Sequence, residues 1–189
     1  MRKILDKFKL FESEGKSFEE ISENIYLNYS SIKDIDLIYK IKKEISKEFS
    51  CGLMQILLIG SSHTGFSKNF EKTEGKDYDF CIIDYQIFEK ILLKVQTTKL
   101  YKNKDNFYKN LSKGKLHYHY VDNELKRELE DIFERIRLNL KISKQISICF
   151  YISERAFIKV IANFLEKQWL QSKTAGRTTI QPLEIIRGV

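Results

Sequence analysis

The chain has 189 residues, of which 42% are hydrophobic and 31% charged, a balance typical of a globular domain and not of a disordered chain. The net charge of +7 is compatible with a nucleic-acid partner, although solvated helix faces explain most of the basic residues, which are spread along the sequence. The sequence has no membrane-length apolar run, no apolar signal-peptide core and no Cys-x-x-Cys among its three cysteines, so we expect a cytoplasmic protein with no membrane contact.

The N-terminal part of the sequence predicts helices. Residues 1–15 form a short amphipathic pattern, and Ser17 followed by two acids is typical of a helix N-cap. Residues 31–49 follow the helical period closely. They contain Asp34 and Asp36, which we interpret as N-terminal helix charges because side chains two apart on a helix face different ways.

The middle of the sequence contains the most informative pattern. Residues 55–59 predict a buried strand that ends at the small-residue turn Gly60–Gly65, where uncovered backbone N–H groups let a phosphate approach closely. A second strand is predicted over 77–84. Side chains two apart in a strand share a face, roughly 7 Å apart, so Asp77 and Asp79 are expected to project together. Adjacent carboxylates repel unless a cation lies between them, and Mg²⁺ suits that place.

Helices and strands are predicted for most of the remaining sequence. A helix over 86–97, a third strand over 116–121 and a long helix after Asp122 follow from periodicity and composition. A last helix is predicted over 154–171, with these residues on its buried side: Phe157, Val160, Ile161, Phe164, Leu165 and Trp169.

Three segments have two interpretations each. Residues 99–114 are polar and lysine-rich, and both a helix and a mobile lid fit them. Residues 146–152 are ambiguous between strand and helix, with alternation favouring a strand. The last residues, 173–189, contain the only proline and read as an arm or a flexible end.

A strand ending in Gly-Ser, a linker and an Asp-x-Asp that opens the next strand resemble the nucleotidyltransferase superfamily, which includes DNA polymerase beta and the small "minimal" nucleotidyltransferases of prokaryotes. The resemblance covers about thirty residues strongly. It implies that Gly60 and Ser61 hold a triphosphate and that Asp77 and Asp79 bind Mg²⁺ or Mn²⁺. The linker of 15 residues between Ser61 and Asp77 is longer than is usual in the family.

The resemblance also implies a third carboxylate on a later strand. Asp122, at the end of the third predicted strand, is the best candidate, and its competing interpretation is the N-terminal cap of the helix that follows. Lys68 and Lys76 flank the predicted site, where either would neutralise triphosphate charge, although both also read as surface lysines.

Two other site types were considered. The spacing from Gly60 to Gly65 fits a P-loop, but Phe66 stands where that motif needs lysine, so we reject it. His117 and His119 would share a strand face, yet no third zinc ligand is evident, and these rings read better as cleft-lining or packing residues. His63 in the turn would touch a phosphate or be a solvent-exposed loop residue.

The sequence therefore predicts an α/β (α+β) fold, with a small mixed sheet and flanking helices in a single domain over residues 1–172. Its expected parts are a helical N-terminal part (1–50), a sheet with the active site (51–122) and a helical C-terminal part (123–172). The implied activity is Mg²⁺-dependent transfer of a nucleoside monophosphate from an NTP, with ATP as the expected nucleotide, to an RNA end such as that of tRNA, a protein side chain or a small molecule. The alternative is an inactive module of the same fold that binds RNA or a partner protein.

Overall fold

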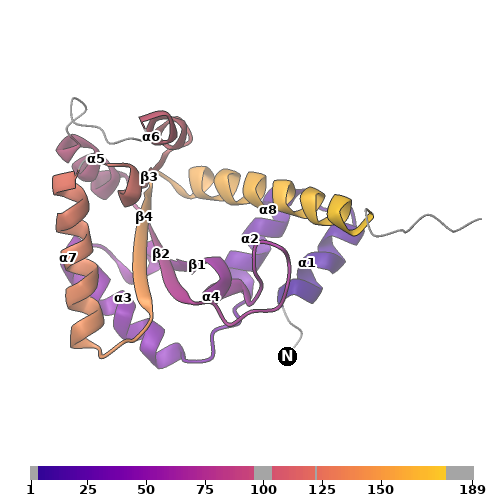
Figure 1. Cartoon of the computed structure of the whole chain (residues 1–189), viewed down its shortest axis with the longest axis horizontal. Coiled ribbons are helices and arrows are strands. Elements are labelled where there is room, and N and C mark those ends of the chain that lie inside the picture. The colour runs from indigo at the N-terminus through magenta and orange to yellow at the C-terminus, as the bar shows by residue number, and fades with distance from the viewer. Residues whose placement is uncertain (1–3, 96–103, 122, 178–189) are drawn as a thin grey trace, which may run out of the picture.

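The computed structural model describes residues 4–95, 104–121 and 123–177. In this part of the chain a four-stranded mixed sheet, in the order β1-β2-β4-β3, lies between two groups of helices (Figure 1). The outer pairs β1–β2 and β3–β4 are antiparallel, and the central pair β2–β4 is parallel. This confirms the predicted α/β class with a small mixed sheet. The strands are β1 (Ile56–Ile59), β2 (Asp77–Ile83), β3 (Lys115–His117) and β4 (Gln145–Tyr151).

Helices precede, connect and follow the strands in the order that the sequence predicts, with differences at their ends. Two short 3₁₀ turns, η1 (Leu53–Gln55) and η3 (Tyr118–Tyr120), lie next to strands. The α-helices in the described residues are α1 (Ile4–Ser13), α2 (Phe18–Asn28), α3 (Ile35–Phe49), α4 (Gly60–Thr64), α5 (Tyr85–Lys94), α6 (Lys104–Leu111), α7 (Asn123–Asn139) and α8 (Glu154–Arg177).

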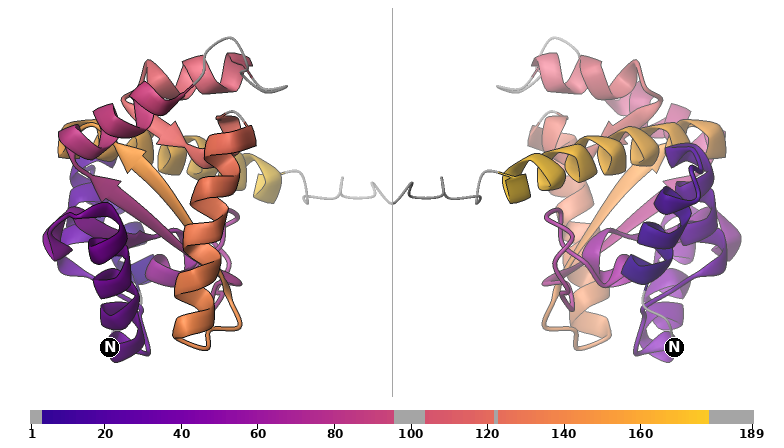
Figure 2. Two further views of the ribbon diagram at one scale, coloured as in Figure 1. Left: turned by 90° about the vertical axis from the view of Figure 1, so that its left-hand side faces the viewer. Right: turned by 90° about the vertical axis from the view of Figure 1, so that its right-hand side faces the viewer.

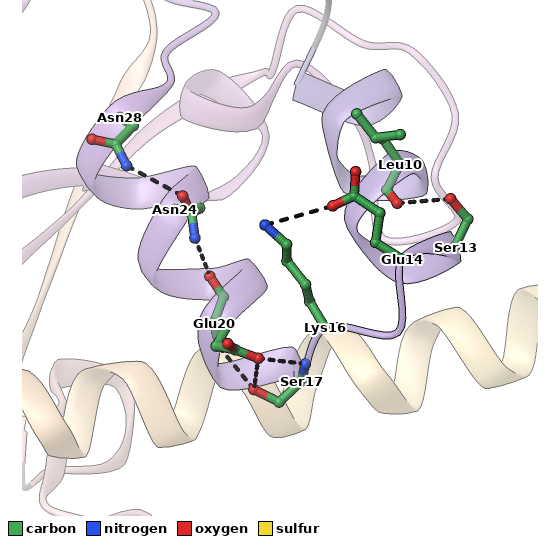
Figure 3. A network of polar contacts seen from close by, with 8 residues as sticks. All are labelled: Leu10, Ser13, Glu14, Lys16, Ser17, Glu20, Asn24 and Asn28. Carbon is green, nitrogen blue, oxygen red and sulfur yellow. Dashed lines mark hydrogen bonds and ion pairs between the residues drawn. The ribbon is translucent and has the colours of Figure 1, made fainter.

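The first helices begin where local side-chain caps satisfy their free N–H groups. The N–H of Glu20 donates to Ser17 Oγ at 3.2 Å, and the N–H of Ser17 donates to Glu20 Oε2 at 2.9 Å, so α2 starts with a reciprocal capping box (Figure 3). Asp34 accepts from the N–H of Leu37 at 2.9 Å and caps α3. Asp34 and Asp36 are therefore helix-start residues, as predicted, and not a second metal pair.

The sheet separates two apolar clusters. One face packs against α3, α5 and α7 through residues such as Phe80 and Ile148. The other face packs against α1, α2 and α8 through Cys81, Cys149 and Tyr151. Figure 2 shows this arrangement from both sides, with α7 in front of the sheet in the left view and α1 and α8 in front in the right view. Because alternate residues face opposite clusters, Asp77 and Asp79 lie on the α8 side.

The position of β4 corrects the predicted division of the chain. The sheet is not confined to residues 51–122, because β4 comes from the part expected to be helical and lies between β2 and β3. The segment 146–152 is thus a strand, as alternation favoured. All four of its residues from Ile148 to Tyr151 are buried, because α7 crosses one face of the sheet and α8 covers the other.

The third strand is shorter than predicted. Strand β3 ends at His117, and residues 118–120 turn into η3 instead of continuing the ladder. The ring of Tyr118 packs edge-on against Phe133 of α7, with centroids 5.2 Å apart, so packing on a helix overrides the strand propensity of this aromatic run. As a consequence, residues 145–148 of β4 have no strand partner on the β3 side among the described residues.

The last helix extends further than predicted, to Arg177 instead of 171. Lys173, placed in the tail by the sequence, is helical and forms an ion pair with Glu12 at 2.5 Å. Phe164 is half exposed and not buried as predicted, while Phe157 and Leu165 are buried. Residues 104–111 of the ambiguous segment 99–114 form α6; residues 99–103 and 178–189 lie outside the described part. No helix in the described ranges is long and apolar enough to span a membrane.

Candidate functional site

The Gly-Ser turn and the Asp-x-Asp motif meet at one end of the β1–β2 hairpin. In the antiparallel register Ile59 lies opposite Asp79, so the first residue of the turn, Gly60, lies beside the Asp79 side chain. A Cβ atom on Gly60 would lie 2.9 Å from Asp79 Oδ2. Gly60 also has a φ of +67°, a conformation that glycine adopts without strain. Both the space and the backbone therefore require glycine at this position.

Asp79 is held from the other side by the neighbouring parallel strand. Ser147 lies opposite Asp79 in the β2–β4 register, and its hydroxyl donates a hydrogen bond to Asp79 Oδ1. Desolvation by burial raises the pKa of the Asp79 carboxyl above its ordinary value of 3.8, and the charge of Asp77 adds to this, while the Ser147 hydrogen bond opposes it. Because the effects that raise the pKa of Asp79 exceed those that lower it, a nearby cation would stabilise the ionised carboxylate.

Asp77 opens strand β2 and is positioned through its backbone. The Ser62 hydroxyl donates to the Asp77 carbonyl oxygen, which ties helix α4 to the start of β2. Gly75 lies against Ser62 so closely that a Cβ atom there would be 2.7 Å from the Ser62 nitrogen. The long linker thus returns to the turn before β2 begins, and its length does not separate the two motifs. Asp77 lies opposite Gln145 of β4.

Cationic and aromatic groups that the motif did not indicate also act on this site. The charges of Lys115 and His119 lower the pKa of Asp79, so both lie within electrostatic reach of its carboxylate. Burial raises the pKa of the Tyr26 phenol, and the nearby thiols and Asp79 raise it further. These residues come from β3, η3 and α2, and no local sequence signal connects them with Asp79. From the sequence, strand alternation in β3 predicts only that Lys115 and His117 share a face of the sheet.

The remaining predicted site residues have different outcomes. Ser61 is the second residue of α4, directly after Gly60. Lys68 and Lys76 are exposed loop residues, and neither is among the groups that alter the pKa of Asp79. Asp122, the candidate third carboxylate, lies outside the described residues.

A cavity of about 320 Å³ lies beside the turn but on the other side of β2. It is lined by Ser61, Ser62 and Leu58, and by Tyr78, whose side chain points away from Asp77 and Asp79 because strand residues alternate. Lys144 lies over the Tyr78 ring at 4.9 Å. The turn therefore contacts both the carboxylate pair and this cavity, and the carboxylates do not line the cavity.

The surroundings of the three histidines differ from those expected from the sequence. His63 is buried, its ring stacks on Tyr26 with centroids 4.7 Å apart, and Nε2 lies 3.2 Å from the Ile25 carbonyl oxygen, so it is not the exposed or phosphate-facing residue considered from the sequence. His117 and His119 do not share a strand face, because β3 ends between them; the His119 N–H donates to His117 Nδ1 at 3.3 Å. Desolvation lowers the pKa of His117 to about 3.

The metal expected from the motif can be tested against these residues. Across the described ranges, no group of three or more His, Cys, Asp or Glu side chains is arranged to hold a metal ion. Asp77 and Asp79 still supply two hard oxygen ligands on one face, and Mg²⁺ commonly binds one or two carboxylates together with substrate phosphates. Burial raises the pKa of Asp79, so a nearby cation would favour its ionised form. The two carboxylates therefore fit one divalent ion that takes its remaining ligands from other groups.

No family model, curated protein or solved structure matches this chain. The assignment of a function consequently depends on the residues of the site and on their geometry.

Proposed function

We propose that the chain is a Mg²⁺-dependent nucleotidyltransferase that moves a nucleoside monophosphate from an NTP to an acceptor. The observation that carries the proposal is the contact between the glycine turn and the carboxylate pair, in which a Cβ atom on Gly60 would lie 2.9 Å from Asp79 Oδ2. A phosphate held by N–H groups at the start of α4 would lie next to two carboxylates. That combination suits a nucleotide triphosphate that shares Mg²⁺ with the protein.

The reaction that this site would support is an in-line substitution at the α-phosphorus. The acceptor hydroxyl oxygen forms a bond to the α-phosphorus, the bond to the β-phosphate oxygen breaks, pyrophosphate leaves, and the acceptor proton passes to a base. Bound Mg²⁺ supplies charge neutralisation for the phosphates. Ser147 holds Oδ1 of Asp79, and the missing side chain of Gly60 leaves room for Oδ2, so this carboxylate stays in one orientation.

The chain contains a matched control for the test of this proposal. Asp77→Asn/Asp79→Asn removes the carboxylates of the proposed site, whereas Asp34→Asn/Asp36→Asn removes the same number of charges from the start of α3 and keeps an asparagine cap. Each protein is incubated with labelled ATP, GTP, CTP or UTP, Mg²⁺ and either RNA, protein or small-molecule acceptors. We expect metal-dependent labelling by the wild type and the α3 variant, and loss of at least a hundredfold in the Asp77/Asp79 variant.

One observation favours a second candidate, the inactive nucleotide- or RNA-binding module. The strand beside Asp79 has Ser147 in register with it, and no third carboxylate is grouped with the pair in the part of the chain that the structure describes. This candidate predicts that Mg²⁺ and ATP stabilise the wild type and do not stabilise Asp77→Asn/Asp79→Asn. It also predicts that no acceptor is labelled. An Asp122→Ala arm separates the two roles of that residue, because loss of labelling at unchanged stability indicates a ligand and loss of stability alone indicates a cap, which alanine cannot provide.

A further inference from the structure

A basic groove lies at the start of α8, away from the carboxylate pair. It has a volume of about 380 Å³, and Lys113, Arg155 and Lys159 line it. The other polar side chains at its wall are neutral, from Ser112, Ser153 and Asn163. Among the residues that the structure describes, no acidic side chain lines this groove, which we call the α8 groove.

The cations of the α8 groove are available to a ligand. Lys113, Arg155 and Lys159 are all exposed. None of them takes part in the ion pairs formed within the described residues, in contrast to Lys94, Arg135 and other surface cations. Three unpaired positive charges around one hollow create a local positive potential that attracts a polyanion.

The groove is a rigid part of the fold. The N–H of Ile152 donates to the Gly114 carbonyl oxygen at 3.0 Å, so the turn before β3 is bonded to the segment that enters α8. A Cβ atom on Gly114 would lie 2.6 Å from Ile152 Cγ2 and 2.9 Å from Ala156 Cβ, which shows how closely the two segments pack. Lys113 and Arg155 are therefore held on opposite sides of a tight backbone contact.

Two half-exposed aromatic residues each lie one helical turn from a residue that lines the groove. Tyr108 lies one helical turn before Ser112 on α6, and Phe164 lies one turn after Val160 on α8, where Ser112 and Val160 line the groove. Each ring belongs to a residue that is 50% exposed. Single-stranded nucleic acid binds to positive grooves with aromatic rings nearby, with its phosphates on the cations and its bases stacked on the rings.

The groove also leads toward the carboxylate pair. Lys115 follows Gly114 and begins β3, where it lies opposite Tyr151, on the same side of the sheet as Asp79. Ser153 at the groove follows the end of β4 by two residues and is six residues from Ser147 at the carboxylate, which is at most about 20 Å at the usual strand rise. A strand of a few nucleotides could span that length.

We propose that the α8 groove binds the phosphate backbone of a single-stranded nucleic acid, with Tyr108 and Phe164 as stacking residues. Its role in directing an acceptor end to Asp77 and Asp79 rests on the nucleotidyltransferase activity proposed above; the binding itself does not. RNA and DNA share the chemistry that the groove recognises.

The test is a fluorescence anisotropy titration without NTP or Mg²⁺, using a labelled single strand of about 16 nucleotides, the upper site size for such grooves. Lys113→Gln/Arg155→Gln/Lys159→Gln is compared with Lys40→Gln/Lys43→Gln/Lys90→Gln, which makes the same net-charge change on α3 and α5. We expect the slope of log affinity against log salt to fall by about 2 in the groove variant, since each lost contact with a single strand contributes about 0.7. The control variant keeps the wild-type slope.

The aromatic residues give a second readout. Tyr108→Ala or Phe164→Ala is expected to weaken binding about tenfold at an unchanged salt slope, because stacking carries no counterion release. Equal slopes for the groove and control variants, absence of binding to both RNA and DNA, or binding only to vesicles of anionic lipid would overturn the proposal.

The same experiment separates this proposal from the nucleotidyltransferase activity. Asp77→Asn/Asp79→Asn should bind the strand as the wild type does. If the strand binds but no acceptor is labelled, the groove stands and the activity fails. If another acceptor is labelled while no strand binds, only the groove proposal fails.

Discussion

Ser147 donates a hydrogen bond to Asp79 Oδ1 from the strand that runs parallel to β2. The resemblance noted from the sequence implies a third carboxylate on a later strand, and at this register position β4 has a hydroxyl. The hydroxyl stabilises the ionised form of Asp79 and directs its other oxygen toward Gly60. Ser147 is therefore a positioning residue for the proposed metal ligand.

Ser147→Ala should weaken Mg²⁺ binding about tenfold, because a hydrogen bond to a charged group contributes roughly 1.5–3 kcal/mol. Isothermal titration of Mg²⁺ in the presence of a non-hydrolysable ATP analogue measures the change. Ser147→Thr keeps the hydroxyl and should restore most of the affinity. Equal affinities for the Ala and Thr variants would show that the hydrogen bond has no part in metal binding.

Gly60→Ala should lose more stability than Gly15→Ala, although both glycines have positive φ, +67° and +74°. Left-handed backbone costs an alanine roughly 1–2 kcal/mol at either site. A Cβ atom on Gly15 meets nothing within 4 Å, whereas on Gly60 it collides with Asp79 Oδ2. Urea unfolding measures both costs. Mg²⁺ and ATP should also no longer stabilise Gly60→Ala. Equal losses of stability in the two variants would contradict the close contact between position 60 and Asp79.

Asp79→Asn should be more stable than the wild type at pH 7 when Mg²⁺ is absent. The folded-state pKa of Asp79 is raised, so folding favours its protonated form, and the wild type loses stability as the pH rises through that value. Below the ordinary pKa of 3.8 both side chains are neutral and the difference should vanish. Thermal unfolding over this pH range checks the sign.

Added Mg²⁺ and ATP should reverse that order at pH 7, because only the wild type gains a ligand that stabilises the ionised carboxylate. An Asn variant that is less stable than the wild type at pH 7 without metal would show that Asp79 is already well compensated in the apo protein.

His63→Gln should reduce the acid sensitivity of the fold. Desolvation lowers the pKa of buried His63 to about 4 from 6.5, while the hydrogen bond to Ile25 opposes the shift and the charge of Lys42 adds to it. Between these values the unfolded chain takes up a proton that the folded chain refuses, so stability falls as the pH falls. The full effect is roughly 3 kcal/mol at about 1.4 kcal/mol per pKa unit.

Urea unfolding at pH 7 and at pH 4 gives the measurement for His63. His117, with a pKa lowered to about 3, acts in the same direction, so the variant should retain part of the acid sensitivity. A wild type and variant with parallel pH profiles would mean that His63 is protonated in the folded state.

Local sequence signals determined the helix starts and the two motifs of the site. The cap of α2 involves Ser17 and Glu20, three positions apart, and the cap of α3 involves Asp34 and Leu37 at the same spacing. Such contacts form between chain neighbours, so the residue types alone predict them. The Asp77 and Asp79 pair follows in the same way from strand alternation.

The tertiary structure alone decided which strands are neighbours and where β3 ends. Ser147 reaches Asp79 across 68 positions of sequence, and Tyr118 leaves the ladder because Phe133 of α7 offers its ring a packing partner. These outcomes depend on competition between distant surfaces for burial, a quantity that no local pattern contains. The sequence thus determined that two carboxylates share a strand face beside a glycine turn. The fold determined which hydroxyl, cations and aromatic rings surround them.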